Sequence, residues 1–172
     1  MLKTLIPAKP AGQTPLFKET SAQKKPDGQR RAHAPGHTIN VDGASRGNPG
    51  LAGAGAVIRD RDGTVVKKLK KFLGSVTNNV AEYQALIMAL EAATHLGLTD
   101  VRIYADSELM VKQINGVYKV KSVDLKPLYD KAMLLIKRLP SVKLSHIMRE
   151  ENSLADAMAN EAIDTRETRH NN

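Results

Sequence analysis

Hydrophobic and polar residues alternate along several stretches of the chain after residue 36, and this pattern predicts five strands. In the first stretch, 38–41, Ile39 and Val41 share one face. The other predicted strands are 53–59, 64–73, 101–105 and 142–148. Asp62-Gly63 separates the second from the third and is typical of a hairpin turn.

Four helices are predicted between and after these strands. They cover 80–95, 107–114, 124–139 and 152–163, with residues 77–79 and Ser107 as caps for the first two. Hairpins require antiparallel neighbours, whereas helical crossovers require parallel ones. The sequence therefore predicts an α/β fold: a mixed five-stranded sheet with helices on both faces.

Residues 1–36 differ from the rest of the chain. They contain five prolines, seven Lys or Arg and two Asp or Glu, without a sustained hydrophobic period. We expect a disordered basic leader at 1–36, a catalytic domain at 37–165 and a flexible tail at 166–172. The net charge of +8 suits a nucleic-acid partner, although such a charge also serves solubility alone.

Composition excludes several classes of protein. The chain has no cysteine, which excludes disulfides, thiolate metal sites and a cysteine nucleophile. No apolar run is long enough to cross a membrane, and the N-terminus lacks the pattern of a secretory signal. We expect a cytoplasmic monomer that has no membrane association.

Four acidic residues lie at predicted element ends. Asp42 ends the first strand, Glu82 lies early in the first helix, Asp106 ends the fourth strand and Asp156 opens the last helix. Strand ends and helix starts meet at one rim of an α/β sheet. Carboxylates gathered there would repel one another unless divalent cations such as Mg²⁺ or Mn²⁺ neutralise them. Taken singly, each acid is more typical of a cap or turn than of a metal site.

The residues around these acids form four motifs in order. They are VDGASRGNPG at 41–50, TNNVAEY at 77–83, YADS at 104–107 and REENSLAD at 149–156. Together they resemble the motifs of type 1 ribonucleases H, the last in the form of archaeal and some bacterial members. The resemblance covers about residues 37–164 and implies a ribonuclease H-like fold.

The resemblance implies an endoribonuclease that hydrolyses the RNA strand of RNA–DNA hybrids. Asp42, Glu82, Asp106 and Asp156 would hold two Mg²⁺ ions, or Mn²⁺, for two-metal-ion cleavage. The products would carry 3′-hydroxyl and 5′-phosphate ends. Glu82 would also lie near the ribose 2′-hydroxyl, the group that marks RNA.

The resemblance also assigns substrate-binding residues. Asn48 and Thr77 would hold a phosphate of the DNA strand, and Asn79 would contact the hybrid in the minor groove. Ser107 belongs to the third motif, and Glu108 stands where many members have a Gln that contacts the RNA strand. An ordinary turn at Asn48 and helix capping at Thr77, Asn79 and Ser107 are compatible with these roles.

Two features depart from the best-known bacterial pattern. His146 lies ten residues before Asp156, as does that branch's mobile histidine, but it falls inside a predicted strand. We therefore favour Arg149 for assistance in proton transfer or product release. Many members also carry a Lys- and Trp-rich helix and loop, the basic protrusion, after the second helix. It is missing here, because 117–126 is short and has no Trp. The basic leader could partly replace the contribution of the protrusion to hybrid binding through counterion release.

Two other functions remain open. Another nuclease or transferase on this sheet, such as an integrase or resolvase, would share the acidic rim but not the Gly-Asn-Pro-Gly and Thr-Asn-Asn motifs. A non-catalytic hybrid-binding module is expected to lose a catalytic acid, and none is lost. A nucleotide-binding switch is disfavoured because no phosphate-cradling glycine loop with Lys follows a strand.

Overall fold

The computed structural model describes residues 36–170, with side chains through residue 166, and contains the predicted five strands. The elements are β1 (His37–Gly47), β2 (Gly50–Arg59), β3 (Val65–Val76), α1 (Asn78–His95), β4 (Asp100–Ala105), α2 (Glu108–Ile114), α3 (Lys126–Arg138), β5 (Ser141–His146), a 3₁₀ helix η1 (Arg149–Asn152) and α4 (Ser153–His170). Nearly all of the predicted leader and the end of the predicted tail lie outside the described residues.

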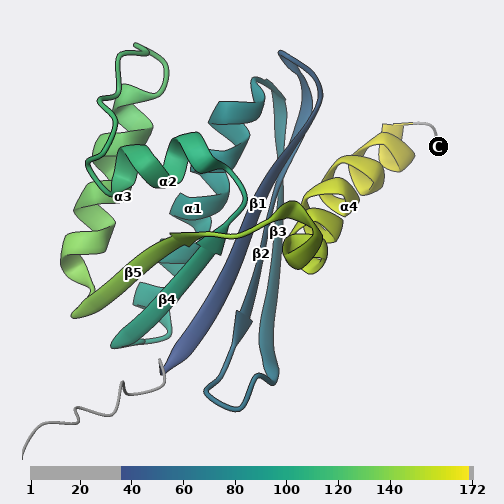
Figure 1. Cartoon of the computed structure of the whole chain (residues 1–172). Helices are drawn as coiled ribbons and strands as arrows, with labels where there is room; N and C mark the ends of the chain where they lie inside the picture. The colour runs from purple at the N-terminus through teal and green to yellow at the C-terminus, as the bar shows by residue number, and fades with distance from the viewer. Residues whose placement is uncertain (1–35, 171–172) are drawn as a thin grey trace, which may run out of the picture. The chain divides into compact units, whose positions relative to one another are not determined.

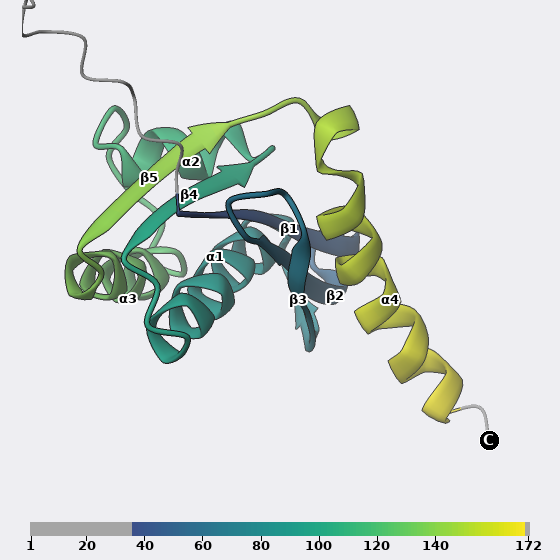
Figure 2. The ribbon, with the colours of Figure 1, turned by 90° about the horizontal axis from the view of Figure 1, so that it is seen from below.

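The strands form one mixed sheet in the order β3-β2-β1-β4-β5 (Figure 1). The pairs β1–β2 and β2–β3 are antiparallel, whereas β1–β4 and β4–β5 are parallel. Helices α1, α2 and α3 lie on one face and α4 on the other (Figure 2). The predicted fold class is confirmed. Within the described part of the chain, no helix combines the length and apolar character needed to span a bilayer.

The main hydrophobic core lies between the sheet and α1. Ile39, Ile103, Leu86 and Leu90 are fully buried there, as the alternation in the strands and the helical spacing of the leucines require. A buried polar contact joins α1 to α2, because the Tyr83 hydroxyl donates to Gln113 Oε1 at 2.7 Å. Burial raises the pKa of that hydroxyl, so it remains a donor.

Helix α4 approaches the backbone of β2 at glycine positions. A Cβ atom on Gly55 would lie 2.3 Å from the carbonyl oxygen of Ala155 and 2.5 Å from the amide nitrogen of Ala159. No side chain fits such a gap, so glycine here sets how closely the first turns of α4 pack on the sheet.

Strand β1 continues past the acidic residue expected to end it. Its parallel pairing with β4 stops at Val41↔Ala105, but its antiparallel pairing with β2 continues, with Asp42 opposite Gly55. The prediction that Asp42 ends the strand was wrong, because β2 supplies backbone partners as far as Gly47.

Other boundaries also differ from the prediction: β2 begins at Gly50 rather than Gly53, and β3 ends at Val76 rather than Leu73. Strand β5 ends at His146 rather than Met148, and α4 runs to His170 rather than Ile163. The division of the chain into a leader, a catalytic domain and a tail stays a prediction.

Candidate active site

Three of the four predicted carboxylates meet where the parallel pairing of β1 and β4 ends. One oxygen from each of Asp42, Glu82 and Asp106 lies within 4.8 Å of the others. Asp42 and Glu82 are only 4% and 5% exposed, and Asp106 is half-buried. They border a cavity of about 190 Å³ whose lining also includes Arg149 and Asn160.

A close approach of β1 to α1 sets the position of Glu82. A Cβ atom on Gly43 would lie 2.3 Å from both Ala81 C and Glu82 N, so only glycine fits. The Gly43 amide then donates to Glu82 Oε2 at 3.1 Å. The Asp-Gly of the first motif is therefore a contact point with α1 as well as a source of one carboxylate.

Burial dominates the electrostatics of this cluster. It is the largest of the causes that raise the pKa of Asp42 from 3.8 to about 8, and the neighbouring Asp106 and Asp156 carboxylates account for the rest of that shift. Burial also raises the pKa of Glu82 well above its usual range, with Asp42 and Asp106 adding to the effect and the Gly43 amide opposing it. Without a cation, the cluster therefore retains protons near neutral pH.

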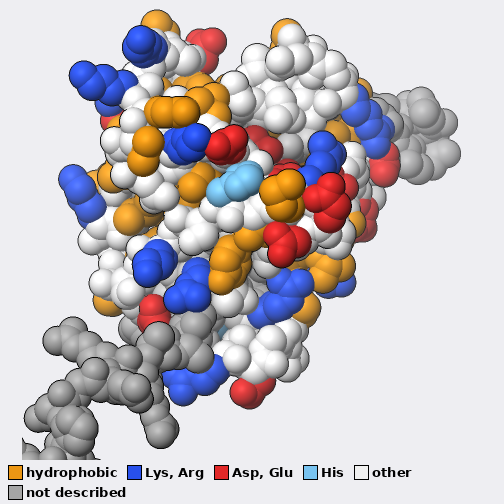
Figure 3. Space-filling model, in the orientation of Figure 1, with side chains coloured by type: hydrophobic (Ala, Val, Ile, Leu, Met, Phe, Trp, Pro, Cys, Tyr) orange, Lys and Arg blue, Asp and Glu red, His pale blue; other side chains and the backbone are white. Residues whose placement is uncertain are grey.

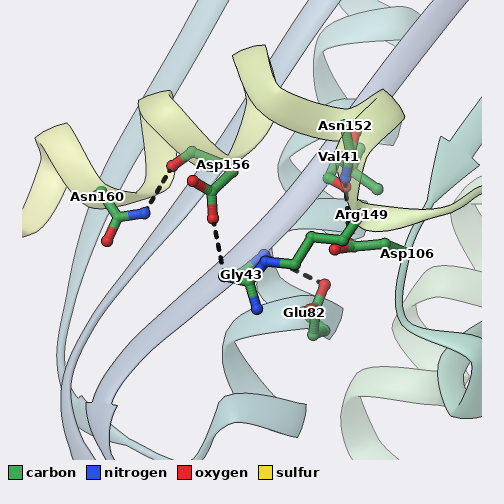
Figure 4. A network of polar contacts seen from close by, with 8 residues as sticks. All are labelled: Val41, Gly43, Glu82, Asp106, Arg149, Asn152, Asp156 and Asn160. Atoms are coloured by element: carbon green, nitrogen blue, oxygen red, sulfur yellow. Dashed lines mark hydrogen bonds and ion pairs between the residues drawn. The ribbon is translucent and has the colours of Figure 1, made fainter.

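Asp156 lies in the first turn of α4, next to Asp42 but outside the set of three. Its side chain accepts a hydrogen bond from Arg149 Nη2 at 3.2 Å, and Figure 4 shows the guanidinium reaching across the site toward it. The arginine is 75% exposed at its side chain, so solvent screens this ion pair.

The cluster contains only oxygen donors, the ligand set that suits Mg²⁺ and Mn²⁺. The raised pKa values are those expected of ligands that lack their cation. The residues present therefore fit a divalent metal site.

Comparison with known proteins places this site in a family. The family model described as reverse transcriptase-like matches residues 40–162. A ribonuclease HI of Halobacterium salinarum is 40% identical over 146 residues, which are 85% of this chain and 71% of that protein. The chain belongs to the type 1 ribonuclease H family.

Solved structures agree with this assignment. The RNase H1 of Halobacterium salinarum has a TM-score of 0.73 and 41% identity, covering 75% of this chain and 98% of that one. LC11-RNase H1, solved in complex with an RNA/DNA hybrid, has a TM-score of 0.73 and 44% identity, covering 76% and 98%. The predicted ribonuclease H-like fold is confirmed.

The chain spans only part of some relatives. A bifunctional protein of Mycobacterium tuberculosis is 44% identical over 127 residues, which are 73% of this chain and 35% of that protein. That relative is therefore much longer than the matched region, and the solved structure of its N-terminal RNase H domain is similar to this chain.

The two candidates for the auxiliary role differ in position. Arg149 lines the acidic cavity, whereas His146 is the exposed last residue of β5 and is absent from the lining. Figure 3 shows acidic side chains and a histidine near the middle of one face, with Lys and Arg around them. The choice of Arg149 over His146 for the auxiliary role stays a prediction.

A second cavity, of about 360 Å³, brings together the two residues predicted to bind the DNA strand and the one predicted to contact the minor groove. Asn48, Thr77 and Asn79 line it, and so do Lys119 and Lys121 from the α2–α3 connection. Two of these side chains also cap α1: Thr77 Oγ1 accepts from Val80 N at 3.3 Å, and Asn48 Oδ1 accepts from Asn78 N at 3.1 Å. Such caps fix the side chains that border the cavity.

The other two predicted substrate residues lie at the start of α2. Ser107 Oγ accepts from Met110 N at 3.4 Å and caps the helix, as predicted. Glu108 is exposed and forms an ion pair of 2.6 Å with Lys112, one turn later. The structure therefore gives both residues local partners within α2.

Two asparagines at the site had no predicted role. Asn152 is 1% exposed and donates to Asp106 Oδ1 at 3.1 Å, and Asn160 donates to the Asp156 carbonyl at 3.0 Å. The i, i+4 spacing of Asp156 and Asn160 was a usable signal, because such residues share a helix face. Asn152 gave no such signal, since its partners are remote in sequence.

We expect Asp42→Asn to stabilise the metal-free protein at pH 8. The folded-state pKa of Asp42 is raised, so its burial costs nothing below the unfolded pKa near 4 and costs progressively more up to about pH 8. The variant removes this cost, which we expect to amount to about 1 kcal/mol or more.

Urea unfolding in chelator from pH 4 to 8 measures the difference, with the exposed turn variant Asp62→Asn as a charge-matched control. Added Mg²⁺ should stabilise the natural protein more than Asp42→Asn. A stability difference that is constant across this pH range would contradict the prediction.

Proposed function

We propose that the protein is an endoribonuclease that hydrolyses the RNA strand of RNA–DNA hybrids. The observation that carries the proposal is the buried cluster of Asp42, Glu82 and Asp106, whose oxygens lie within 4.8 Å of one another. Membership of the ribonuclease H family and the hybrid bound in the LC11-RNase H1 structure support the choice of substrate.

Asp42, Glu82 and Asp106 would hold two Mg²⁺ ions together with Asp156, and Mn²⁺ fits the same oxygens. When bound, such ions supply activation of water and stabilisation of the leaving oxygen, giving 3′-hydroxyl and 5′-phosphate ends. The Gly43 amide keeps the Glu82 carboxylate directed at the site. Arg149 is exposed at the cavity rim. Its guanidinium can therefore leave Asp156 and contact a phosphate or a proton-accepting group instead.

The second cavity would receive a phosphate of the DNA strand. Asn48, Thr77 and Asn79 offer polar groups, and Lys119 and Lys121 add the positive charge that phosphate binding favours. Ser107 and Glu108 would lie beside the RNA strand. A monomeric state and a cytoplasmic location stay predictions from the sequence.

Asp106→Asn should abolish cleavage while leaving hybrid binding in place. The variant removes one ligand charge and keeps the side chain's size, so we expect a loss of activity of roughly 100-fold or more. The assay uses hybrids labelled on either strand, with and without Mg²⁺ or Mn²⁺. Binding without cleavage by the natural protein would favour the binding module, and cutting of the DNA strand would favour another nuclease.

Arg149→Ala should lower kcat roughly tenfold or more, because the guanidinium borders the carboxylate cavity. His146→Ala should change kcat by less than about twofold, since His146 is exposed at the end of β5 and does not border that cavity. Single-turnover cleavage of a hybrid compares the two variants. The reverse order of effects would assign the auxiliary role to His146.

Lys119→Gln/Lys121→Gln should weaken hybrid binding and reduce its salt dependence. Each lost phosphate contact lowers the slope of log K against log salt by about 1. Binding titrations in Ca²⁺, over a range of salt, give the slope.

The control for this prediction is Lys137→Gln/Arg138→Gln at the end of α3, which removes the same charge without touching the cavity. Equal slopes for the two double variants would show that net charge alone, and not the cavity, holds the substrate.

A further inference from the structure

We infer that Arg59 and Asn40 act through the buried Asn152 side chain to position the Asp106 carboxylate for metal binding. The inference rests on the proposed function, because it takes Asp106 as a metal ligand. Arg59, Asn40 and Asn152 are positioning residues, since none of them lines the acidic cavity.

A continuous chain of hydrogen bonds carries the inference. Arg59 Nη1 donates to Asn40 Oδ1 at 2.8 Å, and Asn40 Nδ2 donates to Asn152 Oδ1 at 3.1 Å. Asn152 Nδ2 then donates to Asp106 Oδ1 at 3.1 Å and to the Val41 carbonyl at 2.8 Å. Figure 4 shows the Asn152 amide beside Val41 and Asp106.

Arg59 at one end and the Val41 carbonyl at the other set the direction of the chain. A guanidinium has donors and no acceptor, so Asn40 must present its oxygen to Arg59 and its amino group to Asn152. Asn152 must then accept with its oxygen and donate with its amino group. An asparagine amide alone has two orientations, and the flipped one would set an oxygen against the Asp106 carboxylate. The Val41 carbonyl disfavours that orientation directly, and Arg59 reinforces the same choice through Asn40.

The chain of bonds ends at the point where the two metal-binding strands part. Val41↔Ala105 is the last parallel pair of β1 and β4, and Asp42 and Asp106 are the next residues. Beyond this pair, no β1–β4 ladder hydrogen bond fixes the strands. The Asn152 amino group joins them instead, because it binds the carbonyl before Asp42 and the side chain of Asp106.

The bond from Asn152 occupies Asp106 Oδ1 and leaves the other carboxylate oxygen for a cation. Groups that orient a metal ligand in this way change metal affinity by about 10–100-fold when they are removed. Asn152 is 1% exposed, so water cannot take its place without rearrangement.

The test is Mn²⁺ affinity measured by calorimetry on the full chain, beside kcat and KM for a hybrid. We expect Asn152→Ala to raise the Kd for Mn²⁺ about 10–100-fold. Arg59→Met should raise it severalfold, and Arg59→Lys, which restores a donor, should recover part of the loss. KM for the hybrid should stay within about twofold, since neither residue borders the cavities assigned to substrate.

Arg59→Met separates orientation from charge. Loss of a positive charge by itself strengthens the attraction of a cation, so weaker Mn²⁺ binding identifies the hydrogen-bond effect. It also remains informative if Asn152→Ala fails to fold. The matched control is Asn115→Ala. This variant loses a side-chain amide hydrogen bond of 3.1 Å to the Leu144 carbonyl, away from the acids.

An unchanged Kd in folded Arg59→Met, or an equal rise in Asn115→Ala, would overturn the inference. Absence of Mn²⁺ binding by the natural protein would overturn it too. If the natural protein binds Mn²⁺ but leaves the hybrid intact, the proposed function fails while the comparison of Kd values still decides the role of Arg59 and Asn152.

Discussion

The removal of two carboxylates from water is the constraint on which the rest of this site depends. Asp42 and Glu82 are almost fully buried, and burial of an ionised carboxylate is costly unless a partner offsets it. The protein supplies one backbone donor, Gly43 N–H, to Glu82 and raises the pKa of both acids. A stable fold has no need of such a cluster, whereas a site that binds divalent cations does.

The topology brings these groups together by giving β1 a different neighbour on each side. Its parallel pairing with β4 stops just before Asp42, while its antiparallel pairing sets Asp42 opposite Gly55. Gly55 lets α4 pack directly against β2, because the Ala155 carbonyl of α4 lies where a side chain on residue 55 would be. Ala155 is one residue before Asp156. Gly55, which lies opposite Asp42, therefore allows close packing of α4, the helix that carries Asp156.

The gathering of Asp42, Glu82 and Asp106 could be predicted from the sequence because its signals are local. Strand ends, helix starts and the four motifs each lie within about ten residues. The end of β1 was predicted wrongly, since Asp42-Gly43 has the composition of a turn while its partner strand lies further along the chain. The contact between Asn40 and Asn152 joins residues 112 positions apart, and no periodicity marks either one. The cavity shared by Asn48 and Lys119 depends in the same way on how distant loops fold together.

Two kinds of compensation hold the acids in the absence of a metal. The raised pKa of Asp42 and Glu82 means that protons neutralise the buried pair, while the exposed Arg149 pairs with Asp156. A divalent cation entering the cavity must compete with both. Its affinity should therefore rise with pH as the protons leave. If Asp156 is a metal ligand, as proposed, cation binding would release Arg149 from Asp156. The guanidinium at the rim of the cavity would then be free to bind a phosphate in the bidentate geometry that arginine favours. On this proposal, the residue that pairs with Asp156 in the metal-free site would become available to substrate once a cation is bound.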